Sequence, residues 1–179
     1  MRVPIVTYRL SMRPFEPTDA EAAFAWFGDP VVMRFTPTGP DASIEHTKVR
    51  LAKYQEHQAT HGFSKWIIKD SGSGASIGDA GLLVLDEYRW IDFGFRLSAN
   101  YWGKGLASEA GLAWVHAAFG ELHLNQLNAM VHPDNAASIR VLTKLGFAAE
   151  KRDTLMGMEA ILFSLSARDA QLAQNQGKV

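Results

Sequence analysis

The feature that most constrains this chain is a short glycine-containing segment that joins a strand-like run to a helix-like run. The run Trp90–Leu97 is rich in aromatic and branched residues, as strands are. After the segment Trp102–Ala110, apolar residues recur at roughly helical spacing. A strand followed at once by a helix is typical of a mixed α/β layer fold, in which the helix packs back on the sheet. The joining segment then lies at the N-terminus of that helix.

The residues of this segment are typical of an anion-binding turn. Gly103 and Gly105 allow a ligand to approach the backbone closely, and a first helical turn presents N–H groups that have no intrahelical partner. Lys104 opposes the helix dipole, which is understandable if a bound anion reverses the local charge. For the segment taken alone, a plain strand–helix turn with a solvated lysine remains an equal alternative.

Two common nucleotide-binding motifs are absent. The spacing from Gly94 to Gly103 does not fit G-x-x-x-x-G-K-[ST], and no serine or threonine follows Lys104 directly. No glycine cluster continues into G-x-G-x-x-G. The sequence therefore disfavours a P-loop NTPase and a Rossmann dehydrogenase.

Composition is that of an ordinary globular domain. The chain has 179 residues, of which 47% are hydrophobic and 21% charged, enough for one domain with a substantial core. A formal net charge of −1 predicts no nucleic-acid partner. The absence of cysteine excludes disulfides, thiolate metal sites and a cysteine nucleophile. No run approaches the roughly 20 apolar residues of a membrane span, and no secretion signal is recognisable, so we expect no membrane association and a cytoplasmic location.

The remaining pattern predicts a single α/β (α+β) domain. The expected elements, in chain order, are a strand over 3–13, helices over 18–27 and 41–58, an antiparallel meander over 66–97, a helix over 104–119, a strand over 126–131, a helix over 136–145 and two strands over 147–165. We expect one domain over residues 1–166, with a mixed, mostly antiparallel central sheet flanked by helices. Residues 167–179 are expected to form a polar C-terminal tail.

A second segment, His132–Phe147, predicts a capped amphipathic helix. Asn135 and Ser138 lie one turn apart at its start, where polar side chains can reach a ligand beside the strand end. Leu142 and Leu145 supply its core face. Taken alone, an ordinary capped helix explains this segment better than a binding site does.

Together these segments resemble the GNAT N-acetyltransferases, and most closely their RimJ/RimL-like branch. The resemblance covers nearly the whole chain, and its specific parts are Phe93–Leu97, Trp102–Ala110 and Asn135–Phe147, in that order. The phosphate-loop pattern of the family is Q/R-x-x-G-x-G/A. Gly105 and Ala107 fit its last two fixed positions, whereas a tryptophan stands where glutamine or arginine is usual.

The resemblance implies acetyl-CoA as the cosubstrate and no metal. It implies that the loop cradles the pyrophosphate and that main-chain groups of the preceding strand pair with the pantetheine arm. It also implies that Asn135, at the start of the helix over 136–145, bonds the same arm. The cofactor-binding residues implied are Phe95, Arg96, Leu97, Trp102, Gly103, Lys104, Gly105, Leu106, Ala107, Ser108, Asn135 and Ser138. His57 and His61 are four residues apart, but no nearby acid completes a metal set.

The chemistry expected is direct attack of a primary amine on the thioester, because a cysteine nucleophile is absent. In many relatives a tyrosine four residues before the helix-ending glycine protonates the thiolate, and Leu142 occupies that position here. Ser138 is the candidate for a hydrogen bond to the thiol, with a first-turn serine as the alternative. Asp92 is the candidate base, since this branch often carries an acid there; an exposed strand aspartate is the alternative.

The acceptor implied by the branch is a primary amine, either a small molecule or a protein N-terminus. An N-terminal α-amino group needs less help from a base than lysine does, because its ordinary pKa is about 7.7–8.0 against about 10.4. The alternative function is a non-catalytic acetyl-CoA-binding sensor or scaffold, which the missing tyrosine favours. Related enzymes often form homodimers, but no feature of the sequence fixes the oligomeric state.

Overall fold

Residues 3–175, which the computed structural model describes, form one eight-stranded sheet with the strand order β1-β2-β3-β4-β5-β6-β8-β7. Among the described strands, β5 and β6 are parallel and every other neighbouring pair is antiparallel. The strands are β1 (Ile5–Val6), β2 (Leu10–Pro14), β3 (Lys65–Asp70), β4 (Ser76–Leu85), β5 (Trp90–Leu97), β6 (Gln126–Val131), β7 (Ala148–Leu155) and β8 (Met158–Ser166). The prediction of a mixed, mostly antiparallel sheet is confirmed.

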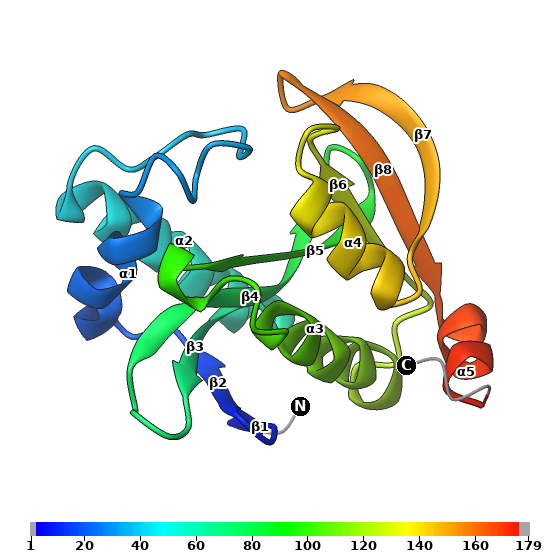
Figure 1. The fold of residues 1–179 in the computed structure, drawn as a ribbon, viewed down its shortest axis with the longest axis horizontal. Helices are drawn as coiled ribbons and strands as arrows, with labels where there is room; N and C mark the ends of the chain where they lie inside the picture. Colours follow the sequence, from blue (N-terminus) through cyan, green and yellow to red (C-terminus); the bar gives the residue numbers. More distant parts are fainter. Residues whose placement is uncertain (1–2, 176–179) are drawn as a thin grey trace.

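Helices cover both faces of this sheet (Figure 1). The α-helices are α1 (Ala20–Phe27), α2 (Ile44–His61), α3 (Leu106–His116), α4 (Ala136–Lys144) and α5 (Ala167–Asn175), and shorter helical turns are η1 (Pro17–Asp19), η2 (Ala99–Tyr101) and η3 (Ala117–Glu121). Ile68 packs in a core that contains residues of α3 and α4, whereas its neighbour Ile67 packs with α1 and α2. Adjacent strand residues point to opposite faces, so the two cores lie on opposite sides of the sheet.

Local signals fix where the longer helices begin and end. Ser43 caps α2 through its hydroxyl, which accepts a hydrogen bond from the N–H of His46 at 3.4 Å, and Gly62 ends the helix with φ of 76°. The side chain of Asn135 caps α4, and Gly146 follows the helix with φ of 90°. Serine and asparagine are favoured N-caps, and glycine adopts the left-handed conformation without steric cost. The helices expected over 41–58 and 136–145 correspond to α2 and α4, and α2 extends three residues further than expected.

The N-terminal strand is not continuous, so the prediction of one strand over 3–13 was wrong. A turn separates β1 from β2, with the N–H of Thr7 donating to the carbonyl of Leu10 at 2.8 Å. The cause is a contact with a distant helix, because the carboxylate of Glu109 in α3 accepts hydrogen bonds from the hydroxyl of Thr7 and the N–H of Arg9. The helix predicted from residue 104 also begins later, at Leu106, and changes after His116 to a π-helical turn.

Strands β5 and β6 diverge on both sides of one contact. Their single registered pair among the described residues joins Asp92 to Asn128. A parallel pair needs a crossover connection, and α3 supplies it here. Since the strands separate beyond the pair, the main-chain groups on one edge of β5 are left available near Phe95–Leu97.

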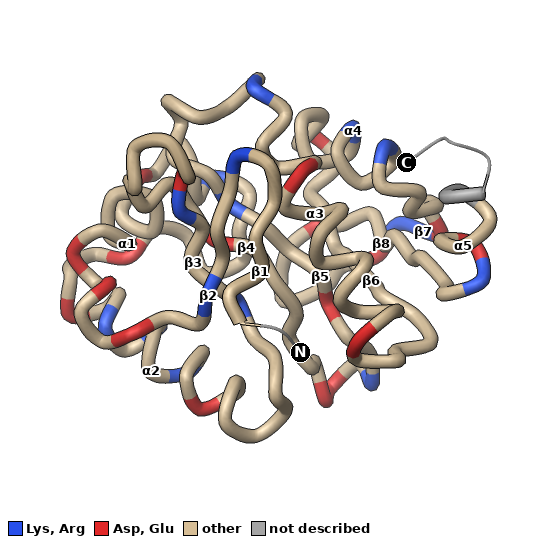
Figure 2. The backbone as a smooth tube through the Cα atoms, turned by 90° about the horizontal axis from the view of Figure 1, so that it is seen from below, with Lys and Arg blue, Asp and Glu red and all other residues tan. Residues whose placement is uncertain are grey.

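Charged residues of both signs are distributed over all parts of the backbone (Figure 2). Of the expected polar tail over 167–179, residues 167–175 form α5, and residues 176–179 lie outside the described residues. Within the described part of the chain, no helix has the length and apolarity needed to cross a membrane.

Candidate active site

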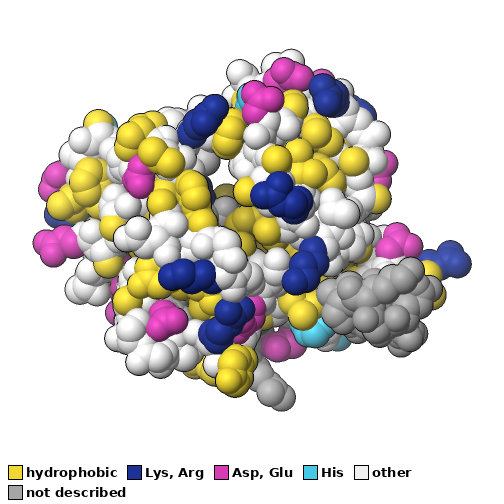
Figure 3. Space-filling view, viewed as in Figure 1, with side chains coloured by type: hydrophobic (Ala, Val, Ile, Leu, Met, Phe, Trp, Pro, Cys, Tyr) yellow, Lys and Arg dark blue, Asp and Glu magenta, His cyan; other side chains and the backbone are white. Residues whose placement is uncertain are grey.

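Two adjoining cavities lie where β5 and β6 diverge. The larger has a volume of about 560 Å³ and is bounded by the segment 101–108, the start of α4 and the segment 31–36. The smaller, of about 230 Å³, is bounded by the segment 35–38, the middle of β5 and the β7–β8 turn. Lining residues shared by both cavities are Phe35, Thr36, Phe95, Arg96, Asn135 and Ser138. Figure 3 shows the hollow on this face, with hydrophobic side chains inside it and basic side chains around it.

The loop before α3 forms one wall of the larger cavity. Gly103 and Gly105 have φ of 73° and 76°, so both require the left-handed conformation that glycine tolerates best. Gly105 is the N-cap of α3 and provides no side chain to bond the first-turn N–H groups. The indole N–H of Trp102 donates to the carbonyl of Leu97 at 2.6 Å, which fastens the loop to the end of β5.

A partly buried carboxylate fixes the other side of this loop. Glu109, in the first turn of α3, accepts a hydrogen bond from Nε of Arg9 at 2.6 Å and another from the hydroxyl of Thr7 at 2.6 Å. Arg9 in turn donates from Nη1 to the carbonyl of Lys104 at 2.8 Å. Burial acts to raise the pKa of Glu109, but these hydrogen bonds outweigh it and hold the pKa below its usual range. Glu109 is therefore a structural tie between the loop and the β1–β2 turn.

The charged residues that line the larger cavity are mainly basic. Its charged residues are Arg34, Arg96, Arg140 and Lys144, against the single acid Asp134 among the described residues. A concave surface lined by one sign of charge raises the local concentration of ligands of the opposite sign. Backbone N–H groups at a helix start and cationic side chains at the rim together suit a ligand that carries phosphate groups.

The smaller cavity contains one side chain suited to proton transfer. Asp92, on β5, is 15% exposed, and its Oδ1 atom has no hydrogen-bond partner within the described residues. Its Oδ2 atom lies 3.8 Å from Nζ of Lys65 on β3. Burial raises the pKa of Asp92 to about 6, and the Lys65 ammonium opposes this shift. Burial also lowers the pKa of Lys65 to about 8. Between these values both groups are charged.

The walls of the smaller cavity are mostly apolar. The rings of Phe35 and His132 stack with centroids 5.0 Å apart, and Met156 of the β7–β8 turn and Met158 at the start of β8 also line the cavity. The hydroxyl of Tyr88 accepts a hydrogen bond from the N–H of Met156 at 3.1 Å. This bond ties the β7–β8 turn to the β4–β5 turn, so two distant hairpins fix the wall together.

The start of α4 lies at the junction of the two cavities. Asn135 accepts a hydrogen bond through Oδ1 from the N–H of Ser138 at 3.1 Å, and both residues line both cavities. Leu142, at the position of the family tyrosine, is 1% exposed and packs in the core. Ser138, one turn before Leu142 on α4, is thus the hydroxyl-bearing residue of this helix that lines the site.

The structure brings together all but one of the residues predicted to bind the cofactor. Those lining the larger cavity are Phe95, Arg96, Leu97, Trp102, Gly103, Gly105, Leu106, Ala107, Ser108, Asn135 and Ser138. Lys104 is the exception: its Nζ lies 5.2 Å from the ring centroid of Tyr101, and the residue is not among those lining either cavity. The assignment of Lys104 to the cofactor site stays a prediction from the sequence.

Sequence reasoning missed a buried ionic network behind β5. Asp79 on β4 is fully buried and accepts hydrogen bonds from Nε and Nη2 of Arg96, at 2.9 and 2.6 Å, and from the indole N–H of Trp26 at 2.9 Å. Arg96 also donates to the hydroxyl of Tyr54 at 3.1 Å. It missed Lys65 as well. The available signal was a charged residue inside an apolar strand run, since such residues are rarely buried unless they are paired.

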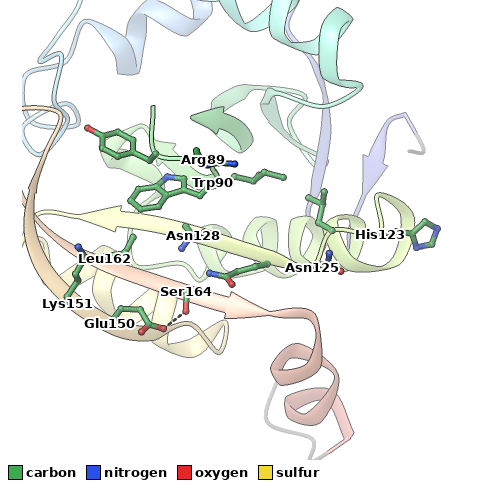
Figure 4. Close-up of a pocket in the computed structure, with 13 residues that line it drawn as sticks. Arg89, Trp90, His123, Asn125, Asn128, Glu150, Lys151, Leu162 and Ser164 are labelled. Atoms are coloured by element: carbon green, nitrogen blue, oxygen red, sulfur yellow. Dashed lines mark hydrogen bonds between the residues drawn. The ribbon is translucent and has the colours of Figure 1, made fainter. Parts of the chain in front are cut away.

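A third hollow lies on the other side of the Asp92–Asn128 pair (Figure 4). It has a volume of about 870 Å³, and its labelled residues come from the start of β5 and the turn before it, from β6 and the loop before it, and from β7 and β8. Glu150 and Ser164 are hydrogen-bonded to each other within it. It shares no lining residue with the two cavities described above and is remote from the glycine loop.

Comparisons with known proteins agree with this geometry. Residues 9–148 match the family model described as an acetyltransferase (GNAT) domain. The uncharacterized N-acetyltransferase YoaA of Bacillus subtilis is 33% identical over 80% of this chain and 82% of its own length. The spermidine N(1)-acetyltransferase of Escherichia coli is 27% identical over 80% of this chain and 75% of its own. The structure of a ribosomal-protein-S5-alanine acetyltransferase from Vibrio fischeri shares the fold, with a TM-score of 0.79 and 22% identity over 94% of this chain and 98% of that one.

Proposed function

Since this chain belongs to the GNAT family of N-acetyltransferases, we propose that it transfers an acetyl group from acetyl-CoA directly to a primary amine, and that this amine is a protein N-terminus. The observation that carries the proposal is the junction at Ser138. There a basic cavity walled by the glycine loop opens into a smaller cavity that contains a buried carboxylate.

The larger cavity suits acetyl-CoA, which supplies the activated acetyl group. The first-turn N–H groups after Gly105 are suited to the pyrophosphate, and Arg140 and Lys144 contribute positive charge near it. On the edge of β5 that faces away from β4, the main chain at Phe95 and Arg96 is available to pair with an extended ligand, as a further strand would. The carbonyl of Leu97 already accepts a hydrogen bond from Trp102, so the pairing is confined to the residues before it.

Asp92 is suited to accept the proton of the attacking amine. Asp92 lines the smaller cavity, its Oδ1 atom has no hydrogen-bond partner among the described residues, and its pKa of about 6 leaves the carboxylate ionised at neutral pH. An α-amino group lies about 2 pH units above this value and a lysine about 4. Proton transfer from an N-terminal amine is therefore the less unfavourable of the two. This difference supports a protein N-terminus over a lysine side chain.

The charge of the smaller cavity disfavours a polyamine. Among its described lining residues Asp92 is the one acid, and the cations Arg50 and Arg96 are each bound by a carboxylate outside the lining. A polyamine carries further ammonium groups beyond the one that reacts, and this lining offers them no second carboxylate. A peptide N-terminus carries one ammonium group and a neutral chain, and the apolar wall at Met156 and Leu83 suits a small first side chain. This assignment keeps the chain near the RimJ/RimL-like branch.

Ser138 is suited to stabilise the departing thiolate by a hydrogen bond from its hydroxyl. It lies at the junction of both cavities, whereas the buried Leu142 has no polar group to offer. Leu142 is also the observation that favours the second candidate function, an acetyl-CoA sensor or scaffold without catalysis. A homodimer and a cytoplasmic location stay predictions from the sequence.

Calorimetric titration with acetyl-CoA, with CoA and ATP as comparison ligands, tests the binding step. We expect selective binding of acetyl-CoA and CoA over ATP. Thiol release is then measured with an alanine-initiated peptide, the same peptide blocked at its N-terminus but containing lysine, and spermidine. Turnover of the unblocked peptide alone supports the proposal. Binding without turnover of any amine favours the sensor, and absence of binding by folded protein rejects both.

A further inference from the structure

Lys65 lies in a channel that two glycines create across the centre of the sheet. It is paired in register with Gly81 on β4, and Gly81 is paired with Gly94 on β5. The three residues therefore form one row across three adjacent strands. Because the second and third residues of this row have no side chain, the lysine side chain extends along the row from β3 to β5. Its side chain is 3% exposed.

The ammonium group occupies a defined position at the end of this channel. Nζ donates to the carbonyl of Gly81 at 2.8 Å and to the carbonyl of Gly94 at 3.2 Å. A lysine ammonium has three protons to donate. The carboxylate of Asp92 lies 3.8 Å away, so the remaining positive charge faces that carboxylate. A Cβ atom at position 94 would lie 2.8 Å from Nζ, which means that only glycine leaves the ammonium this space.

We propose that Lys65 is a positioning residue for the acetyl transfer: its ammonium, 3.8 Å from Oδ2, keeps Asp92 in the ionised, proton-accepting form. The inference rests on the proposed function only in taking Asp92 as the base. Asp92 receives the proton, and Lys65 touches neither the amine nor the thioester. A carboxylate buried without this cation would be protonated over much of the neutral range, since burial disfavours the charged form.

The arginines around Asp92 are already paired. The titratable groups that line the cavity with it are Arg96 on β5, Arg50 and Tyr54 on α2 and His132 after β6, and Asp79 on β4 is buried behind them. Arg96 is bound by Asp79, and Arg50 is bound by Asp41 at 2.6 Å. Among the described residues that line the cavity, Lys65 is therefore the cation that is paired with Asp92.

The test is the pH at which the Asp92 carboxyl titrates, followed by its carbon-13 chemical shift and assigned by its loss in Asp92→Asn. We expect a midpoint at about pH 6 in the parent protein. In Lys65→Met, we expect the midpoint to move up by about 1–3 pH units, because an opposite charge at this distance has been removed. Gly94→Ala is the second variant, since its added methyl group displaces Nζ without a backbone clash. A smaller upward movement is expected there.

Lys69→Met is the matched control. Lys69 lies on the same strand and the same face as Lys65, at the far end of β3, and lines neither cavity. In Lys69→Met we expect the Asp92 carboxyl to titrate at the same pH as in the parent protein. An unchanged midpoint in folded Lys65→Met would overturn the proposal. If that variant does not fold, an unchanged midpoint in Gly94→Ala would overturn it instead.

The pH profile of kcat/KM connects the titration to the reaction. For a midpoint moved up by 2 pH units, Lys65→Met should lose about 25-fold in kcat/KM at pH 6.5 and little at pH 9. If Lys65 serves stability alone, its substitution would lower kcat/KM by the same factor at all pH values, and that result would overturn the proposal. If the parent protein acetylates no amine, the proposed function fails, while the carboxyl titration still decides whether Lys65 holds Asp92 ionised.

Discussion

The buried pair of Asp79 and Arg96 should be a main determinant of the stability of the site. Asp79 is fully buried on β4 and bonds Arg96 on β5 through two hydrogen bonds and Trp26 on α1 through a third. Arg96 continues the connection to Tyr54 on α2. The substitution Asp79→Asn keeps the shape of the side chain but removes its charge. It also turns an amide donor toward the guanidinium or the indole, where acceptors are needed.

The expected loss follows from leaving Arg96 without its counter-charge. Removing one partner of a buried ion pair costs about 3–5 kcal/mol in the free energy of unfolding. Because the Arg96 side chain is 15% exposed, water compensates part of the lost bonding, and we expect the lower half of this range. For a chain of this size each kcal/mol shifts the thermal midpoint by about 2–4 °C. Asp79→Asn should therefore lower the midpoint by about 6–16 °C.

Thermal and urea unfolding of Asp79→Asn measure this loss directly. Glu45→Gln is a suitable control, because Glu45 and Lys48 form an ion pair at 3.3 Å on the exposed face of α2, and we expect no measurable change there. In the double variant Asp79→Leu with Arg96→Met, most of the stability should return, since an apolar pair replaces an ionic one at little net cost. A loss below about 1 kcal/mol in Asp79→Asn would show that Arg96 is solvated and that the pair does not hold β5 in place.

Three further substitutions test the proposed site. Gly105→Val should weaken acetyl-CoA binding more than about tenfold, because its side chain fills the loop. Gly74→Val, at φ of 73° in a remote turn, is the control: it shares the backbone strain of about 1–2 kcal/mol but should leave the affinity unchanged. Equal affinities in the two variants would reject the assignment of the loop to the phosphate groups. Ser138→Ala should lower kcat about 10²-fold with acetyl-CoA affinity unchanged, and a parental kcat would reduce Ser138 to a helix-start residue. Because the folded pKa of Glu109 is lowered, its stabilising contribution is present above the ordinary glutamate pKa and is lost as the pH falls below it. Glu109→Gln should therefore flatten the stability profile in that acid range, and an unaltered profile would contradict the tie to Arg9.

The sequence predicted the parts of the site that local pattern determines. The β5–loop–α3 unit and the start of α4 depend on glycines, caps and periodicity within about 20 residues, so Gly105, Asn135 and Ser138 were found. The turn at Thr7 was missed because its cause, Glu109, lies far along the chain. The contact of Lys104 with the ring of Tyr101 was not predicted either, although the two residues are close in sequence.

The row of Lys65, Gly81 and Gly94 could not have been read from the sequence, because strand register brings these residues together. The presence of this row indicates that function, rather than stability, explains at least one of its residues. A buried ion pair stabilises a fold no better than apolar residues of similar volume, and glycines weaken the strands that contain them. At Gly81 the fold itself excludes a side chain, because a Cβ atom would lie 2.1 Å from the carbonyl of Ser64. At Gly94 the atoms that a Cβ would meet are those of Lys65 and Asp92 themselves. Stability therefore explains the first glycine, whereas the second is explained by the need to hold an ammonium group beside Asp92.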